Sequence, residues 1–253
     1  MKNLLAVGIV AIVGWSCQPA NNEAIDYGNP PSEGFNMAES DPAAIELADS
    51  IMVAIGGRTN WDATRFISWN FFGRRNLVWD KATGRVRIES IPDSTTYLIN
   101  VNTMEGKVQI KGKELMASDS VTKMLNKAKS IWINDSYWLV MPFKLKDSGV
   151  TLKYMGEDTL VNQNYYNLLQ VTFENVGDTP KNKYDLYVDV KDNLIKYWSY
   201  YSDAEQDSAN WTRPWDNYQQ YGNILLSADR SDGLGPKNVK VDKEMPDDVF
   251  TKF

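Results

Sequence analysis

Apolar and polar residues alternate along most of the chain, and this pattern predicts a protein built mainly of β-strands. In residues 65–72, for example, Ile67 and Trp69 fall on one side of an extended chain and Ser68 and Asn70 on the other, which is the period of two of a half-buried strand. Short turns between neighbouring runs indicate antiparallel pairing. The same alternation predicts strands at residues 75–80, 85–89, 95–101, 107–110, 137–143, 150–155, 165–174, 183–190, 194–201 and 223–228.

Two segments instead repeat their apolar residues every three or four positions, which predicts two amphipathic helices. The first starts at Asp41, which can cap it, and stops before Gly56. The second starts at Asp119 or Ser120 and continues to about Trp132. We therefore expect a mainly β (α+β) fold, in which a curled antiparallel sheet or half-open β-barrel is covered on one side by helices.

The N-terminal residues have the pattern of an export signal. Lys2 precedes an apolar run over residues 4–13, which is too short for the roughly 20 residues of a membrane-spanning helix. The run is followed by Cys17, the only cysteine, and residues 13–17 resemble a bacterial lipobox, in which the cysteine carries acyl chains. We expect a signal peptide at 1–16 and membrane attachment through acyl chains on Cys17. The alternative is cleavage by an ordinary signal peptidase, which would leave Cys17 removed or idle.

Residues 17–40 separate this signal from the first predicted helix. They are polar and contain Pro, Asn and Gly without any periodicity, which predicts a lipidated flexible tether. The rest of the chain, residues 41–253, is expected to form a single β-rich binding domain.

The composition narrows the functions open to this domain. The chain has 33 acidic and 27 basic residues and no histidine, so it lacks the basic surface that nucleic acid requires. Without histidine it can have neither a Ser-His-Asp nor a Cys-His site, and no nucleophile elbow, phosphate loop or His/Cys metal motif is present. We expect a binding protein rather than an enzyme, with no cofactor and no metal.

One carboxylate pair lies on a predicted strand. Asp185 and Asp189 are four residues apart, which is about 13 Å along a strand and too far for a retaining glycosidase. Alternation against Leu186 and Val188 predicts that both carboxylates face solvent, so we expect no catalytic role for them.

One face of several predicted strands carries more large aromatic side chains than a thin core needs. We expect these residues to line a concave apolar surface that can hold a lipid chain, and the alternative is that they only fill the core. The cavity candidates are Trp69, Phe71, Trp79, Trp138, Phe173 and Trp198.

Two further groups are candidate binding residues. Lys144 and Lys146 point the same way from a predicted strand end, where they could bind an anionic head group or only keep an edge soluble. Aromatic residues near the C-terminus resemble a platform that stacks on sugars, which would make the protein a glycan-binding surface lipoprotein, or they could seal the open end of the sheet. This aromatic group consists of Trp211, Trp215, Tyr218 and Tyr221.

The order of the elements over residues 41–201 resembles that of a group of envelope lipoproteins from Bacteroidota-type bacteria. The most distinctive segments are MPFKLKD at 141–147 and FENVGDTP at 173–180. At fold level that group is similar to LolA and LolB, a periplasmic carrier and an outer-membrane receptor whose half-open barrel with a helical lid holds acyl chains. The resemblance implies a membrane-anchored lipoprotein that binds a lipid or acyl chain. Residues 18–22 lack the dense acidic run of surface-exported lipoproteins, so we expect the outer membrane, facing the periplasm.

The lipid anchor makes the first testable prediction. Intact mass measurement of the mature protein from the membrane fraction should show acyl chains on Cys17, and the Cys17→Ala variant should lose both the added mass and stable membrane attachment, because each buried methylene contributes about 0.8 kcal/mol. An unmodified Cys17 in the membrane fraction would contradict the prediction.

Overall fold

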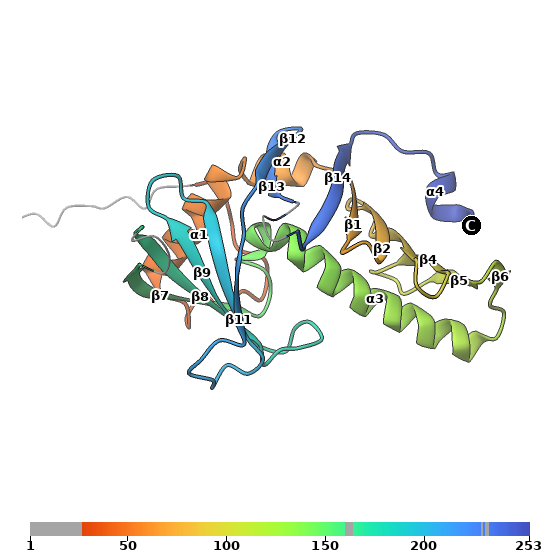
Figure 1. The fold of residues 1–253 in the computed structure, drawn as a ribbon, viewed down its shortest axis with the longest axis horizontal. Helices are drawn as coiled ribbons and strands as arrows, with labels where there is room; N and C mark the ends of the chain where they lie inside the picture. Colours follow the sequence, from red (N-terminus) through yellow and green to blue (C-terminus); the bar gives the residue numbers. More distant parts are fainter. Residues whose placement is uncertain (1–26, 160–163, 229, 231–232) are drawn as a thin grey trace, which may run out of the picture.

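Most of the strands form two antiparallel sheets that lie side by side along the long axis of the molecule (Figure 1). The computed structural model describes residues 27–159, 164–228, 230 and 233–253, so the predicted signal peptide and Cys17 lie outside the described residues. Within those ranges, the expected mainly antiparallel β fold with a few helices is confirmed, and the curled sheets do not close into a barrel.

Sheet A has seven strands in the order β14-β1-β2-β3-β4-β5-β6. Its inner face is apolar because alternate residues of each strand point the same way. The strands are β1 (Phe66–Phe71), β2 (Arg75–Asp80), β3 (Arg85–Ser90), β4 (Thr95–Asn100), β5 (Gly106–Ile110), β6 (Lys113–Glu114) and β14 (Pro236–Asp242).

Sheet B has five strands in the order β11-β10-β9-β8-β7, and a separate hairpin consists of β12 and β13. Within sheet B, neighbours in sequence are neighbours in space, as the short turns predict. The strands are β7 (Val150–Asp158), β8 (Tyr166–Phe173), β9 (Lys183–Asp189), β10 (Ile195–Tyr201), β11 (Trp211–Pro214), β12 (Tyr218–Tyr221) and β13 (Ile224–Ser227).

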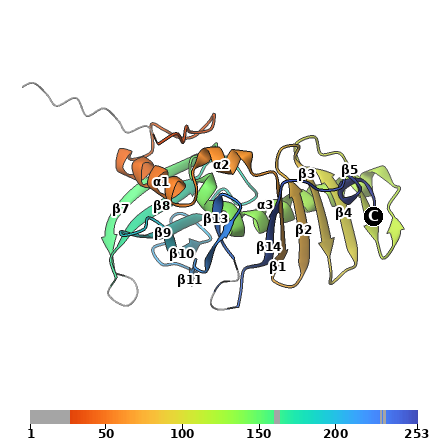
Figure 2. The same ribbon diagram turned by 90° about the horizontal axis from the view of Figure 1, so that it is seen from above.

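The helices pack against the sheets, and one of them spans both. Among the described residues, no helix is long and apolar enough to cross a membrane. The longest, α3, extends from sheet A to sheet B in both views, while α1 and α2 lie next to one another along one side (Figures 1 and 2). The helices are α1 (Pro42–Ala54), α2 (Arg58–Ala63), α3 (Ser118–Val140), the 3-10 helix η1 (Met141–Lys144) and α4 (Asp248–Thr251).

The prediction of a strand at residues 137–143 is wrong, because α3 continues to Val140. The last turns of α3 are apolar around much of their circumference, with Leu139 and Val140 buried and Trp138 packed against the core. A helix that is covered on several sides shows no amphipathic period, and this run of aromatic and branched residues therefore looks like a strand. The helix ends where Pro142 cannot donate a backbone hydrogen bond.

An arginine from the distant end of the chain compensates for that missing donor. In an α-helix the carbonyl of Trp138 would accept from the amide of residue 142, which is a proline here. Instead, Nη2 of Arg230 donates to the Trp138 carbonyl at 2.7 Å, and the Arg230 guanidinium lies 4.0 Å from the ring centre of Trp215. The end of α3 is therefore held by a residue 92 positions later in the sequence.

The flexible tether expected to reach residue 40 is wrong for its described part, residues 27–40. The amides of Asn36 and Asp41 donate to backbone carbonyls of β7, and Ser40 Oγ accepts from the Leu152 amide at 3.0 Å. This segment closes the free edge of β7, which would otherwise expose unpaired backbone groups. Asp41 does not cap α1, because its carboxylate accepts from Lys153 Nζ and the Tyr154 amide at 3.1 Å each.

The sequence pattern missed β14, which pairs antiparallel with β1. Its alternation is interrupted at Asn238, which has a φ of 52°, and the register shifts between Ser68 and Asn70 of β1. Such a bulge inserts an extra residue and hides the period of two. The short strands β6, β11 and β12 were also missed, since two to four residues are too few to show an alternation.

A buried ion pair fixes α3 to sheet A. Arg75 of β2 donates to both carboxylate oxygens of Asp135 on α3, at 2.6 and 2.8 Å, and the Asp135 side chain is completely buried. Burial raises the pKa of the Asp135 carboxyl, while the hydrogen bonds from Arg75 and Asn134 oppose that rise. The pair therefore keeps a charged carboxylate inside the protein through two strong contacts.

Removing the arginine should destabilise the fold strongly. Arg75→Met leaves the Asp135 carboxylate buried without its cation, so we expect the free energy of unfolding in urea to fall by about 3 to 5 kcal/mol at neutral pH. The loss should shrink as the pH falls and Asp135 binds a proton, because a raised folded-state pKa favours the folded state at low pH.

The matched control is Arg58→Met. Arg58 pairs with Asp62 at 2.9 Å on the exposed side of α2, and the loss of such a surface pair changes stability by less than about 1 kcal/mol. Equal losses in the two variants would contradict the role given to the buried pair.

Candidate functional site

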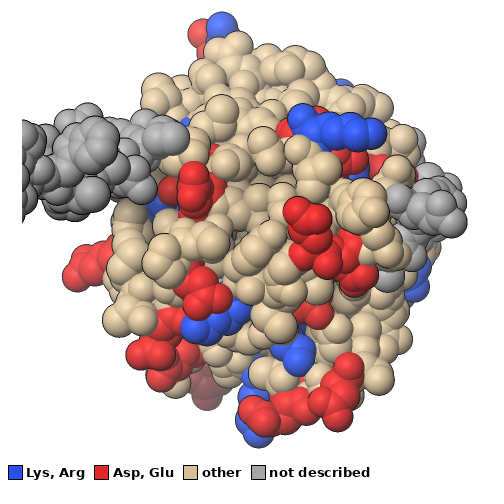
Figure 3. Space-filling model, turned by 90° about the vertical axis from the view of Figure 1, so that its left-hand side faces the viewer, with Lys and Arg blue, Asp and Glu red and all other residues tan. Residues whose placement is uncertain are grey.

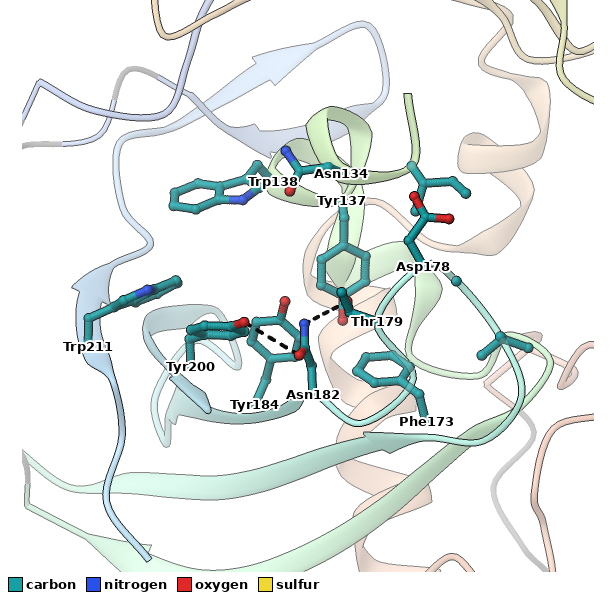
Figure 4. A pocket seen from close by; sticks show the side chains of 13 residues that line it. Asn134, Tyr137, Trp138, Phe173, Asp178, Thr179, Asn182, Tyr184, Tyr200 and Trp211 are labelled. Atoms are coloured by element: carbon teal, nitrogen blue, oxygen red, sulfur yellow. Dashed lines mark hydrogen bonds between the residues drawn. The ribbon is translucent and has the colours of Figure 1, made fainter. Parts of the chain in front are cut away.

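A pocket of about 470 Å³ opens between the last turns of α3 and the inner face of sheet B. The loop between β8 and β9 forms its other wall (Figure 4). The lining residues are Ile133, Asn134, Tyr137, Trp138, Phe173, Val176, Gly177, Asp178, Thr179, Asn182, Tyr184, Tyr200 and Trp211.

Strand register explains why three of the aromatic side chains meet here. Tyr200 of β10 lies opposite Tyr184 of β9 and also opposite Trp211 of β11, so all three side chains point to the same face of the sheet. The Tyr200 ring lies 5.1 Å from that of Trp211 and 5.5 Å from that of Tyr184. Figure 4 shows these rings facing Trp138 and Tyr137 of α3 across the cavity.

Trp198 supports this wall from below. Its side chain is completely buried, and its ring stacks on that of Tyr184 at 5.3 Å. It also meets Trp138, Trp211 and Trp215 edge to face, at 4.8, 5.1 and 4.9 Å between ring centres. Since two of these rings line the pocket and one seals the core behind it, the position of the pocket wall depends on Trp198.

The polar groups of the pocket are mostly engaged with one another. Asn182 donates to Thr179 Oγ1 at 2.7 Å and accepts from the Tyr200 hydroxyl at 3.4 Å, and Asn134 donates to Asp135 at 2.9 Å. Asp178 is the only charged residue among the described lining residues.

The phenols in the wall are neutral. Burial raises the pKa of Tyr137 well above its ordinary value of 10, and burial raises that of Tyr184 as well. Both hydroxyls therefore keep their protons at physiological pH and do not act as bases. In the described part of the chain, no group of three His, Cys, Asp or Glu residues could hold a metal ion.

Of the six predicted cavity residues, the structure brings three together. Trp138 and Phe173 line the pocket, and Trp198 lies directly beneath it. Trp69 and Trp79 are instead buried in the core of sheet A, where Trp79 packs on Trp132 of α3 at 5.3 Å. These two follow the alternative of simple core packing.

Phe71 is also buried and does not line the pocket. Its ring lies 6.1 Å from that of Trp138. Phe71 therefore packs from sheet A against a residue that lines the pocket. The alternation of aromatic residues thus identified buried positions but could not separate the two inner faces, which belong to different sheets.

The two lysines predicted to bind a head group pair with carboxylates of the protein instead. Lys146 is buried and pairs with Asp49 of α1 at 2.7 Å, and Asp49 also accepts from Asn29 at 2.7 Å. Lys144 lies in η1, not at a strand end, and pairs with Asp147. Neither lysine lines the pocket, because the strand on which their orientation rested does not exist.

The predicted sugar-stacking platform is also divided. Trp211 lines the pocket, whereas Trp215 is completely buried in the core. Tyr218 and Tyr221 are partly buried in β12 and pack against the same core. Trp215 and the hairpin therefore pack into the core, and only Trp211 of this group reaches the pocket.

The prediction that Asp185 faces solvent is wrong. Asp185 is buried, with 7% of its surface exposed, and it accepts from the Tyr201 hydroxyl at 2.7 Å and from Gln170 at 3.1 Å. It lies on the same face of sheet B as Tyr187 and Tyr201, whose side chains are also buried.

Sequence reasoning missed several lining residues. Tyr184 and Tyr200 share an alternation with Trp198, so the strand pattern contained a signal for both. Tyr137 and Asn134 could not be found, because they meet Trp138 on one side of a helix that was expected to end before them. The loop residues Asp178, Thr179 and Asn182 carry no periodic signal.

A family model described as a family of unknown function, DUF6503, matches residues 94–233. The chain belongs to the DUF6503 family. The matched region includes α3, sheet B and every residue that lines the pocket. No curated protein matches this DUF6503 chain.

Three solved structures are similar to this DUF6503 protein. A DUF1329 family protein from Desulfovibrio piger is 13% identical, covering 83% of this chain and 98% of that one, with a TM-score of 0.43. A domain described as an outer membrane lipoprotein-sorting protein from Vibrio parahaemolyticus is 10% identical, covering 83% and 97%, with a TM-score of 0.39. A LolA superfamily protein from Nitrosomonas europaea is 11% identical, covering 81% and 97%, with a TM-score of 0.32.

The central role of Trp198 can be tested by comparison with Trp211. Trp198→Ala removes a fully buried ring that contacts several others, so we expect the free energy of unfolding to fall by about 3 to 5 kcal/mol. Trp211 lies at the edge of sheet B and is only partly buried, so Trp211→Ala should cost about 1 kcal/mol. Urea unfolding followed by circular dichroism measures both, and a reversed order would contradict the assignment of Trp198 to the core.

Proposed function

We propose that this protein is a membrane-anchored envelope lipoprotein that binds a hydrophobic ligand, a lipid or acyl chain, in the pocket between α3 and sheet B. The observation that carries the proposal is the ring-lined pocket itself. Six of its described lining residues are Phe, Tyr or Trp, and burial of apolar ligand surface against such side chains contributes about 25 cal/mol per Å².

The size and construction of the pocket support this function. Its volume of about 470 Å³ falls within the roughly 300 to 1,000 Å³ of small-molecule sites. The walls come from a helix and from paired strands, and Trp198 supports the rings from behind. A wall of this kind is formed before the ligand arrives, which lowers the entropy that binding must offset.

The anchor and location belong to the same proposal. Cys17 lies ten residues before the first described residue. Ten residues of extended chain span at most about 36 Å. Acyl chains at Cys17 would hold the pocket near a bilayer, on the outer membrane facing the periplasm, where a lipid ligand is abundant.

A binding role fits the chemistry of the pocket better than catalysis. The chain contains no histidine, and the phenols of the wall are held neutral by burial. Catalysis by two carboxylates needs one group as the acid and another as the base. Asp178 is the one carboxylate among the described lining residues. We therefore propose a non-enzymatic protein.

Glycan binding is the second candidate, because the stacked pair of Trp211 and Tyr200 lines the pocket. Against it, the amide of Asn182 and the hydroxyl of Thr179 are paired with each other, which leaves fewer partners for sugar hydroxyls. Calorimetric titration with oligosaccharides, showing heat that Trp211→Ala abolishes, would favour this candidate.

Filling the pocket should abolish hydrophobic binding. Asn134 lies exposed at the pocket on α3, so Asn134→Trp should place a large ring there, at the loss of the hydrogen bond that Asn134 donates to Asp135. We expect the affinity for the neutral fluorescent probe N-phenyl-1-naphthylamine to fall at least tenfold, measured by fluorescence titration.

The matched control is Asn126→Trp, which makes the same exchange at an exposed site on α3 outside the pocket. It should bind the probe as the wild type does. Equal binding by all three proteins would show that the probe does not enter this pocket and would contradict the proposed function.

A further inference from the structure

The hydrogen-bonding state of the pocket restricts the head group that a ligand can carry. Asn182, Thr179 and Tyr200 are joined to one another, and Asn134 is joined to Asp135. A ligand with many hydroxyl groups would find part of these donors and acceptors already engaged. A ligand without polar groups would leave them intact.

One lining group stands apart from this network. In the described part of the chain, the Asp178 carboxylate has neither a hydrogen-bonding side chain nor an ion-pair partner, and no Lys or Arg lines the pocket. Figure 4 shows Asp178 on the loop between β8 and β9, on the side of the cavity opposite Trp211. An anionic ligand would meet this carboxylate without any compensating cation, whereas a cationic ligand would neutralise it.

The rings of the pocket offer a second attraction for a cation. The face of an aromatic ring is electron-rich, and an ammonium group within about 6 Å of it is attracted electrostatically. The same rings already serve in this way elsewhere, because the Arg213 guanidinium lies 5.6 Å from the ring centre of Trp211 and that of Arg230 lies 5.8 Å from Trp138. Neither arginine is among the described residues that line the pocket.

The wider electrostatic field acts in the same direction. The chain has a formal net charge of −6, and acidic side chains are spread over the end of the molecule formed by α1 and the edge of sheet B (Figure 3). A negatively charged protein raises the local concentration of cations and lowers that of anions.

We propose that the ligand of the pocket is a cationic amphiphile, an apolar chain that carries a substituted ammonium head group paired with Asp178. This inference rests on the proposed function, since it names the head group of the hydrophobic ligand. The chain of the ligand contacts the rings on α3 and sheet B, and its ammonium group lies against ring faces within reach of the Asp178 carboxylate.

A series of ligands with one chain and three heads tests the head group. Dodecyltrimethylammonium, dodecyl maltoside and dodecanoate, each below the concentration at which micelles form, are used to displace N-phenyl-1-naphthylamine from the wild-type protein at pH 8 and low salt. Dodecyltrimethylammonium should act at a concentration about tenfold lower than dodecanoate, with the maltoside between them, because one cation–π contact and one charge pair together reach about that factor.

Two variants that replace a carboxylate by a carboxamide test whether Asp178 causes the preference for the cation. Asp178→Asn should reduce the preference for the cation over dodecanoate to about threefold, because the ring faces are unchanged. Asp119→Asn removes a carboxylate in the first turn of α3, at the opposite end from the pocket, and should leave the preference unchanged. Asn134→Trp should weaken all three ligands together.

The outcomes distinguish a failure of the proposed head group from a failure of the proposed binding pocket. Failure of all three amphiphiles to displace the probe would contradict the proposed function itself. Displacement with equal strength by the three, or most strongly by dodecanoate or the maltoside, would leave the pocket assigned and overturn the cationic head group. A cation preference that Asp178→Asn does not reduce would also overturn it, and tetramethylammonium as effective as the dodecyl compound would overturn the amphiphile.

Discussion

The structure depends on α3 being held against two different sheets. Near its C-terminal end, Arg75 of sheet A reaches the buried Asp135 carboxylate with two hydrogen bonds. One turn later, Trp138 packs on Trp198 of sheet B. Since the two contacts are three residues apart on one helix, they set the position of sheet B relative to sheet A. The pocket lies beside them, so its shape follows from the same contacts and not from the loops alone.

The pocket exists because the covering of sheet B is incomplete. The inner face of the sheet is buried near Leu152 and Leu186, and α1 packs on β7, but the rings of Tyr184 and Tyr200 face the last turns of α3 across an open space. The loop between β8 and β9 reaches over this uncovered part without filling it. A core that ended in small residues would close here, whereas large flat rings that support one another leave a cavity with rigid walls.

Local patterns in the sequence were sufficient for the longer strands of both sheets except β14, and for the first helix, because each of these has one buried face and a simple period. They were insufficient at the end of α3, where burial on several sides removes the period, and at β14, where the bulge at Asn238 interrupts it. Partners distant in sequence were also beyond reach. Nothing near Lys146 indicates that Asp49 will pair with it, 97 residues away, and a surface lysine was the reasonable expectation. The site was found in part. Strand alternation identified the buried rings of Phe173 and Trp198, but Trp138 was placed on a strand where the structure has α3, and the other helix residues that face the pocket were missed.

The same ring-to-ring contacts that stabilise the core near the pocket also indicate what the pocket can bind. In the described part of the chain, the indole nitrogens of Trp198, Trp215 and Trp79 are buried without a conventional hydrogen-bond acceptor, and an unpaired buried donor costs about 1 to 3 kcal/mol. The rings meet edge to face, with interplanar angles of 87° between Trp138 and Trp198 and 82° between Trp198 and Trp215. In an edge-to-face pair the positive edge of one ring lies against the electron-rich face of the next, which contributes about 0.5 to 1.5 kcal/mol. The ring faces of the core thus already accept positive partial charge. Ring faces of the same kind line the cavity, where an ammonium group would occupy the place that an indole edge has inside the core.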